Sequence, residues 1–396
     1  MNKGIAVTGM GIISSIGRNQ EETYKALISG KNGLSFIENF TTKHTELPAG
    51  EVKITNKELL ASLKINPTQP YTRVSLLGII AAKEAITNAQ LSKEELSNCG
   101  FISGTSVGGM DATEKYYSDF ENGVNTQFIK AQHPGFTTNQ IANYLDIKGK
   151  IATISTACSS AANAIMLGCR MIESGKLKRV IVGGSDALTK FTLNGFNSLM
   201  ILSNQPCKPF DDDRKGLNLG EGAAYLVLEA DDIIGNKKVL GRVKGYGNAN
   251  DSFHQTASSP EGEGAYLAMK KALKSAGLDH DQIDYIHAHG TATRNNDLSE
   301  STAIHRVFGN KLPEFSSTKG YTGHTLAAAG GIQAVMNLLM LENQEVFPNL
   351  NFEHSMKETG FYPVIIKKQK NLNYILSNSF GFGGNCTSLI FGKDED

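Results

Sequence analysis

Short β-prone apolar runs alternate with longer amphipathic stretches along the chain, and this alternation restricts the fold more than any other feature of the sequence. The runs that read as buried strands are Ile5–Thr8, Val180–Val182, Tyr225–Leu228 and Leu389–Phe391. Leu76–Ala89 and Ala265–Ala276 have apolar residues three and four apart, which is the spacing of a helix face. The alternation predicts an α/β protein.

Length and charge limit the class of protein to which the chain can belong. The 396 residues suggest two or three domains from length alone, although no low-complexity linker divides the chain. Lysine plus arginine equals aspartate plus glutamate, at 39 each, so a nucleic-acid partner is not expected. Two irregular stretches, Lys31–Gln69 and Gly247–Gly264, are predicted to be ordered surface loops.

The cysteines and the N-terminus indicate the compartment. The five cysteines are an odd number without CxxC or CxxH spacing, which disfavours a disulfide framework or a zinc site and favours a reducing cytoplasm. The apolar N-terminus is broken by glycine, serine and threonine, so a strand and a glycine turn explain it better than a signal peptide does. No apolar run approaches the roughly 20 residues of a membrane span.

One cysteine lies at a predicted strand-to-helix turn. The segment 151–175 begins β-prone and ends with Ile165, Cys169 and Ile172 on one helix face, and Gly175 can close the helix. Cys158 therefore precedes a helix N-terminus, which predicts a lowered thiol pKa and a nucleophilic thiolate. Cys99, Cys169 and Cys207 are interpreted as buried structural residues.

Two histidines lie in glycine-flanked turns. His289 ends a strand-like run and is followed by Gly290, whereas His324 follows Gly323 and is predicted to open a helix of small residues. A helix N-terminus disfavours imidazolium, so His324 should be a neutral hydrogen-bond donor. A metal site at His287 and His289 lacks a third ligand at a matching spacing, so neither a metal nor another cofactor is predicted.

A glycine-rich turn precedes the last predicted strand. Gly381, Gly383 and Gly384 interleave there with Phe380 and Phe382. Glycine lets a backbone approach a ligand closely, and a tight turn before the strand is compatible with that role.

These motifs together resemble the class I/II β-ketoacyl-acyl carrier protein synthases. The resemblance rests on STACSS around Cys158, AHGTAT around His289, TGHTLAAAG around His324 and NSFGFGG near the end, and it extends along the chain in the family's order. It implies a thiolase-like five-layered α-β-α-β-α fold made of two pseudo-repeated halves. Residues 1–235 would carry the nucleophilic cysteine and residues 236–396 both histidines.

The resemblance also implies roles. Cys158 would hold an acyl chain as a thioester, and the N–H groups of Cys158 and Phe382 would bind the oxyanion. His289 and His324 would stabilise the enolate left when a malonyl group loses carbon dioxide. The remaining family positions are Thr291 and Thr293 for the pantetheine arm, Val107 for the acyl pocket, Phe380 and Phe382 for a mobile gate, and Lys319 for ordering the site.

The implied partner is an acyl carrier protein, and the chain would form a homodimer or a heterodimer with a related chain. Two alternatives stay open: a chain-length partner subunit, which would usually lack the nucleophile, and a thiolase or acyltransferase that uses coenzyme A. A thiolase would be expected to use a second cysteine, and an initiating synthase to replace one histidine with Asn.

Three departures from the family pattern point to a specialised chain. Gln333 replaces a frequent glutamate, which predicts that Lys319 lacks a charge partner. Asn385 and Cys386 replace a frequent Thr-Asn pair. The basic run before the helix at 72–85 is reduced to Lys64 and Arg73, which implies a different carrier-docking surface. Elongation of a polyene-type chain is the prediction, and neutral drift in an ordinary fatty-acid synthase is the alternative.

Overall fold

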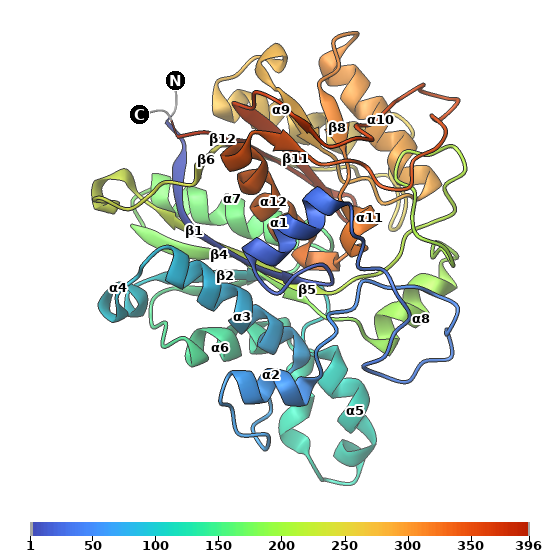
Figure 1. Ribbon diagram of the computed structural model, residues 1–396. Helices are drawn as coiled ribbons and strands as arrows, with labels where there is room; N and C mark the ends of the chain where they lie inside the picture. Colours follow the sequence, from blue (N-terminus) through green and yellow to red (C-terminus); the bar gives the residue numbers. More distant parts are fainter. Residues whose placement is uncertain (1–2, 395–396) are drawn as a thin grey trace.

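The computed structural model describes residues 3–394, and most of its strands belong to one large sheet (Figure 1). The strands of the N-terminal half are β1 (Ile5–Ser14), β2 (Gly100–Gly104), β3 (Ile151–Ile154), β4 (Arg179–Asp186) and β5 (Gly222–Glu229). Those of the C-terminal half are β6 (Gly241–Asn250), β7 (Tyr285–His287), β8 (Glu314–Ser316), β11 (Tyr374–Phe380) and β12 (Asn385–Gly392). A separate pair joins β9 (Glu345–Val346) to β10 (Lys368–Gln369).

The two halves of the sheet repeat one arrangement. The strand order is β3-β2-β4-β5-β1 in the first half and, read from its far edge, β8-β7-β11-β12-β6 in the second. In both halves the first three strands are parallel and the last two are added antiparallel. The predicted pair of pseudo-repeated halves is therefore confirmed. Their predicted boundary after residue 235 falls between β5 and β6 and stays a prediction.

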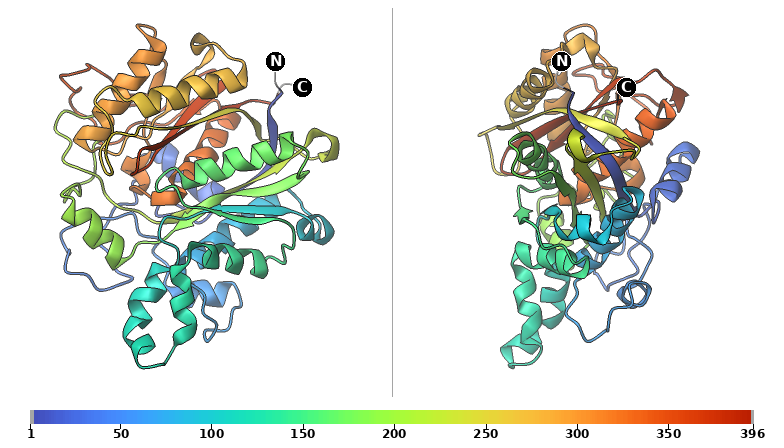
Figure 2. Two further views of the ribbon diagram at one scale, coloured as in Figure 1. Left: turned by 180° about the vertical axis from the view of Figure 1, so that it is seen from behind. Right: turned by 90° about the vertical axis from the view of Figure 1, so that its left-hand side faces the viewer.

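Helices form the other three layers. Two central helices, α7 (Ser160–Glu173) and α12 (Ala329–Asn343), pack against each other between the two halves of the sheet. The outer faces are covered by α3 (Arg73–Asn88) on β1 and β5 and by α9 (Glu263–Ala276) on β6 and β12 (Figures 1 and 2). This is the five-layered thiolase-like arrangement that the resemblance implied.

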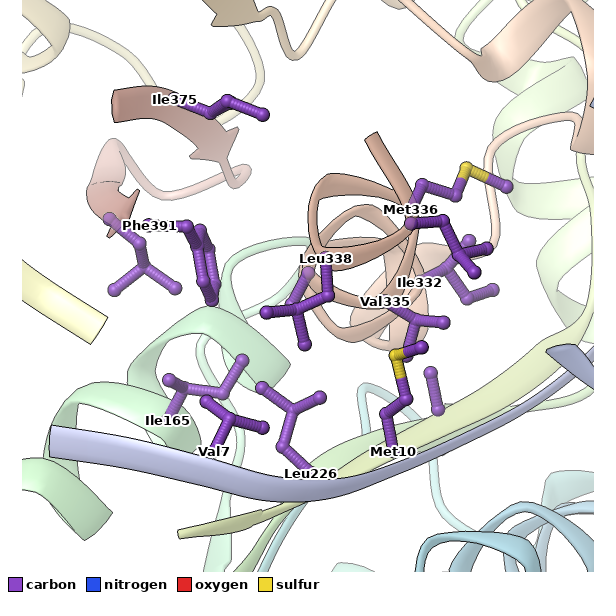
Figure 3. Packing of buried hydrophobic residues seen from close by; sticks show 14 of the residues in the cluster. Val7, Met10, Ile165, Leu226, Ile332, Val335, Met336, Leu338, Ile375 and Phe391 are labelled. Carbon is purple, nitrogen blue, oxygen red and sulfur yellow. The ribbon is translucent and has the colours of Figure 1, made fainter. Parts of the chain in front are cut away.

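The largest core lies between the halves. It joins Val7 of β1, Leu226 of β5, Ile165 of α7, Val335 of α12 and Phe391 of β12, as Figure 3 shows. α12 is buried along nearly its whole length. Either half alone would expose to water the apolar face that it packs against the central helices, which is unfavourable. The two halves thus share the largest core, and further clusters lie under α9 in the C-terminal half and under α3 in the N-terminal half.

The remaining helices lie around these layers. They are α1 (Gln20–Ser29), α2 (Asn56–Ser62), α4 (Lys93–Ser97), α5 (Met110–Glu121), α6 (Pro134–Tyr144), α8 (Lys190–Ser198), α10 (Arg294–Phe308), α11 (Lys319–Thr322) and the 3-10 turns η1 (Thr126–Gln132), η2 (Asp231–Ile233), η3 (His280–Gln282) and η4 (Leu326–Ala328). No helix within residues 3–394 is long and apolar enough to cross a membrane.

Both stretches predicted as loops contain regular structure. Within 31–69, helix α2 begins after Thr55, whose side chain accepts from the Glu58 N–H while the Glu58 carboxylate accepts from the Thr55 N–H. This capping box, a T-x-x-E pattern, was visible in the sequence. Residues 247–250 continue β6, and α9 begins at Glu263. The loop prediction was therefore wrong at these positions.

Candidate active site

Cys158 lies in a strained turn between β3 and α7. Ala157, just before it, has a φ of 52°, which is uncommon for a residue other than glycine. Ser160 fixes the turn, because its Oγ accepts from the Thr156 N–H at 2.9 Å and donates to the Ala157 carbonyl at 2.6 Å. α7 begins at Ser160, so the predicted strand-to-helix turn is confirmed.

His324 is the histidine that contacts the cysteine. Its Nε2 lies 3.1 Å from the Cys158 Sγ, and its Nδ1 accepts from the Leu326 N–H at 3.3 Å. The neutral ring therefore carries its hydrogen on Nε2, directed at the sulfur. His324 does not open α12 as predicted, since η4 separates it from that helix. Burial, with a smaller effect of the Lys319 charge, holds the His324 pKa well below its usual value and keeps the ring neutral.

Lys319 fixes the tautomer of His289. The Lys319 Nζ donates to the His289 Nδ1 at 3.3 Å and to the His289 carbonyl. With Nδ1 accepting, the His289 hydrogen is also on Nε2. Burial, the Lys319 charge and His324 hold the pKa of His289 well below its usual value. The ring centroids of the two histidines are 5.3 Å apart, so two neutral N–H donors stand side by side.

The cysteine is a thiol rather than a thiolate in this environment. Burial raises the pKa of Cys158 to about 11, against the opposing effects of the Lys319 charge and of the Phe382 and Cys158 N–H groups. The predicted lowering of the pKa is therefore wrong, because Cys158 is only 6% exposed and loses more solvation than the nearby positive groups restore. The His324 N–H stabilises the thiolate once it forms.

A buried glutamate that the sequence reading missed organises the His289 turn. The Glu300 carboxylate accepts from the N–H groups of His289 and Gly290, both at 2.8 Å, and from the Asn378 amide at 3.1 Å. Burial raises the pKa of Glu300 to about 7. Its charge acts on Lys319, whose pKa burial lowers to about 8. Lys319 has no ion pair within residues 3–394, and the Glu300 charge only partly offsets the effect of burial on its pKa.

Gln333, at the position of the frequent glutamate, has a different role. Its amide donates to the Ala288 carbonyl at 3.1 Å and to the His287 carbonyl at 3.4 Å, just before His289. His287 itself donates from Nδ1 to the Asn337 side chain at 2.7 Å and faces Thr318 with Nε2. It is packed within the protein, as one reading of its position predicted.

A cavity of about 390 Å³ reaches the reactive residues. Cys158, His289 and His324 line its inner part, with Phe380 and Phe382 beside them. Thr291 and Thr293 line its wall, and their hydroxyl oxygens are 2.9 Å apart. Lys215 and Arg294, both exposed, lie at the outer side of the same cavity. The sequence reading missed these two cations, because nothing local marks a residue as lining a cavity mouth.

A second, apolar cavity of about 290 Å³ meets Cys158 from another side. Val107 lines it together with Phe191, Leu199 and Leu326. Phe382 lines both cavities and stacks on Phe196, with ring centroids 5.6 Å apart. All the predicted site residues except Lys319 therefore line one or both cavities, and Lys319 contacts His289 from behind.

Two other groups lie away from this site. Arg73, counted as a basic docking residue, is 5% exposed and pairs with Glu221 at 2.6 Å, so it is not part of a docking surface. Within the described residues, the one cluster with metal-ligand geometry is Asp211, Asp213 and His354.

A repeated α/β body with one buried cysteine facing paired neutral histidines defines a thiolase-like condensing enzyme. Family models show which branch of that class applies. The model of the Beta-ketoacyl synthase N-terminal domain matches residues 2–232, and that of the C-terminal domain matches residues 240–353. The chain belongs to the beta-ketoacyl synthase family.

Known relatives agree with this assignment. The 3-oxoacyl-[acyl-carrier-protein] synthase 2 of Staphylococcus aureus is 33% identical, over 100% of this chain and 99% of the relative. The Vibrio cholerae protein of the same name is 34% identical, over 98% and 99%. Among solved structures, a chain of the ishigamide ketosynthase/chain length factor has a TM-score of 0.93 at 28% identity, covering 99% of this chain and 100% of that one. A ketosynthase (ApeO) in complex with its chain length factor (ApeC) from Xenorhabdus doucetiae has a TM-score of 0.85 at 30% identity, covering 98% of each chain.

Proposed function

We propose that the chain elongates acyl groups carried by an acyl carrier protein, using malonyl carrier as the extender. In the first half-reaction the Cys158 sulfur attacks the acyl thioester, and the carrier thiol leaves with the proton. The tetrahedral oxyanion is held by the N–H groups of Cys158 and Phe382. The apolar cavity lined by Val107 suits the acyl chain, since its lining is almost wholly apolar and includes Cys158.

In the second half-reaction malonyl carrier enters the cavity of about 390 Å³ that holds Cys158, His289 and His324. The bond between the carboxylate and C2 breaks, carbon dioxide leaves, and its electron pair forms an enolate. The Nε2–H groups of His289 and His324 donate to the enolate oxygen. C2 then attacks the acyl carbon, and the Cys158 thiolate leaves to give a 3-ketoacyl thioester. The single observation that carries the proposal is this pair of neutral Nε2–H donors beside one cysteine.

The cavity mouth supports a carrier-bound substrate. A carrier's phosphopantetheine arm has a thioester end, amide groups and an outer phosphate. Cys158 lies at the inner end of the cavity, hydroxyl groups line its wall, and Lys215 and Arg294 stand outermost. Neither cation has an ion pair within residues 3–394. We assign these two side chains to the phosphate, and Thr291 and Thr293 to the amides.

Reversing both charges, with Lys215→Glu and Arg294→Glu, should lower kcat/KM for malonyl carrier about tenfold, because rim charges steer an acidic partner. The measurement compares malonyl carrier, malonyl coenzyme A and phosphate-free malonyl pantetheine. Pantetheine should be little affected, and Lys176→Glu, a remote exposed lysine, serves as the control. An equal loss with pantetheine would contradict the phosphate assignment. Wild-type preference for coenzyme A would instead support the alternative of a coenzyme A-dependent enzyme.

A second candidate is a specialised synthase that pairs with a related chain. The two structures named above contain a ketosynthase together with a chain length factor. The reduced basic run before the helix at 72–85 and the Asn385-Cys386 pair also favour a specialised synthase. The chain-length partner role itself is disfavoured, because Cys158 and both histidines are present. We place the enzyme in the cytoplasm, in keeping with its five free cysteines.

Specialisation predicts a substrate and partner preference. Polyunsaturated acyl carriers should be elongated faster than saturated ones, and a co-expressed related chain should increase that preference by shaping the apolar cavity. The assay measures elongation rates for both substrates with and without the partner. Faster elongation of saturated chains by the homodimer would end the specialised hypothesis and leave an ordinary fatty-acid synthase.

A further inference from the structure

The two N–H groups proposed to bind the oxyanion belong to segments far apart in the chain. The Cys158 N–H lies in the turn after β3, and the Phe382 N–H lies in the loop 381–384 between β11 and β12. Both lie close enough to the Cys158 sulfur to lower its pKa. Paired donors of this kind work only when they are held to within about 0.5 Å of the productive geometry.

The backbones of the two segments touch. A Cβ on Gly381 would lie 2.7 Å from the Thr156 carbonyl oxygen and 3.2 Å from the Cys158 nitrogen, so only glycine fits there. The Gly381 N–H donates to the Asn385 carbonyl at 2.8 Å, which closes the loop onto the first residue of β12. Asn385 is therefore one anchor of the loop, beside the bonds from the Gly383 N–H to the Gln255 carbonyl at 2.7 Å and from the Asp251 N–H to the Gly384 carbonyl at 2.8 Å.

Asn385 is tied by its side chain to the nucleophile turn. Its Oδ1 lies 2.7 Å from the Ser159 Oγ, 2.8 Å from the Asn163 Nδ2 and 2.9 Å from the Asn248 Nδ2. Ser159 directly follows the nucleophile, Asn163 is in the first turn of α7, and Asn248 is in β6. One oxygen thus joins three elements at the base of the loop.

A second set of hydrogen bonds holds the side chains that contact the Asn385 Oδ1. The Asn163 Oδ1 accepts from the Thr387 Oγ1 at 2.8 Å and from the Asn248 Nδ2 at 3.0 Å. The Asn163 Nδ2 also donates to the Thr156 Oγ1 at 2.9 Å. Ser159 and Thr387 are fully buried and Asn163 is 6% exposed. Asn385 and Asn248 are partly buried. The buried part of such a network resists displacement, because a shift leaves a polar group unpaired at low dielectric.

We propose that Asn385 is a positioning residue that holds the loop 381–384 in register with the nucleophile turn, and so aligns the Phe382 N–H with the Cys158 N–H. The proposal rests on the proposed function, in which these two groups bind the oxyanion. Asn385 lines neither of the two cavities and acts through the loop that follows Phe380. A purely structural role would affect folding stability alone, whereas a positioning role also changes the chemistry at Cys158.

The test replaces Asn385 with leucine, which has a similar size but no acceptor oxygen. Single-turnover acyl transfer from acyl carrier to Cys158 should slow about tenfold, since misplaced donors lose transition-state stabilisation. The apparent pKa of Cys158, read from the pH profile of iodoacetamide alkylation, should rise because the Phe382 N–H no longer lowers it. Thermal unfolding is measured in parallel to separate these effects from stability.

Two further variants keep the test decisive. Asn248→Ala removes one donor to Asn385 from β6 and should shift both readouts in the same direction by less, and it replaces Asn385→Leu if that variant does not fold. Asn88→Ala, which loses a bond to the Met10 N–H far from the site, should change neither readout. Wild-type acyl transfer and alkylation in both network variants would overturn the inference. Absence of acyl transfer in the wild type would instead refute the proposed function.

Discussion

Replacing Cys158 with alanine should abolish acyl transfer to the protein and lower condensation about a thousandfold or more, because the covalent intermediate can no longer form. Cys158 is the cysteine whose sulfur faces His324 at 3.1 Å and lies at both cavities. Mass spectrometry of the intact protein after incubation with acyl carrier measures the loss. The truncation removes one sulfur atom at a substrate-facing position, so the fold should persist.

The matched control for this variant is Cys386→Ser. Cys386 also lines the cavity of about 390 Å³, and burial raises its thiol pKa well above the usual value. It lacks a histidine partner among the described hydrogen bonds, so its substitution should leave acyl transfer largely intact. If acylation persisted in Cys158→Ala and disappeared in Cys386→Ser, the nucleophile would be Cys386 and not Cys158.

Replacing either histidine with alanine should separate the two half-reactions. Loss of one oxyanion-type donor costs on the order of a hundredfold or more in rate, so carbon dioxide release from malonyl carrier should fall by that factor. Acylation of Cys158 should persist at a substantial rate in both variants. His324→Ala should slow it more than His289→Ala, since His324 also donates to the sulfur.

Carbon dioxide release and acyl transfer are measured separately for each variant. His305→Ala, an exposed histidine on α10, controls for nonspecific effects and should match the wild type. Unchanged decarboxylation in His324→Ala would refute its donor role. Equal loss of both half-reactions in His289→Ala would mean that the turn had collapsed rather than that a donor was missing.

The buried charges around these histidines explain why they stay neutral. Lys319 is a cation at neutral pH even with its pKa lowered to about 8, and it faces the His289 Nδ1. A positive charge there both fixes the tautomer and opposes protonation of the ring. The sequence reading placed Lys319 near the site but derived the neutrality of His324 from the N-terminus of a predicted helix, whereas η4 lies between His324 and α12.

The sequence by itself determined the fold class and the order of the motifs, and it predicted that Cys158, His289 and His324 form one site. Apolar periodicity indicated the strands and helices, and a small-residue turn singled out Cys158. The roles of the two histidines came from the resemblance to a known family. The capping box of α2 was equally local and could have been recognised.

The tertiary structure decided what depends on residues that are distant in the chain. Four features follow from contacts between segments more than 10 residues apart: the pKa values of Cys158 and Lys319, the burial of Arg73 and the network around Asn385. Desolvation and through-space charge have no signature in a local pattern, because they depend on what the fold packs around each group. The residue types thus fixed which chemistry is possible. The packing of the fold set the protonation states of these residues and the alignment of their hydrogen-bond donors.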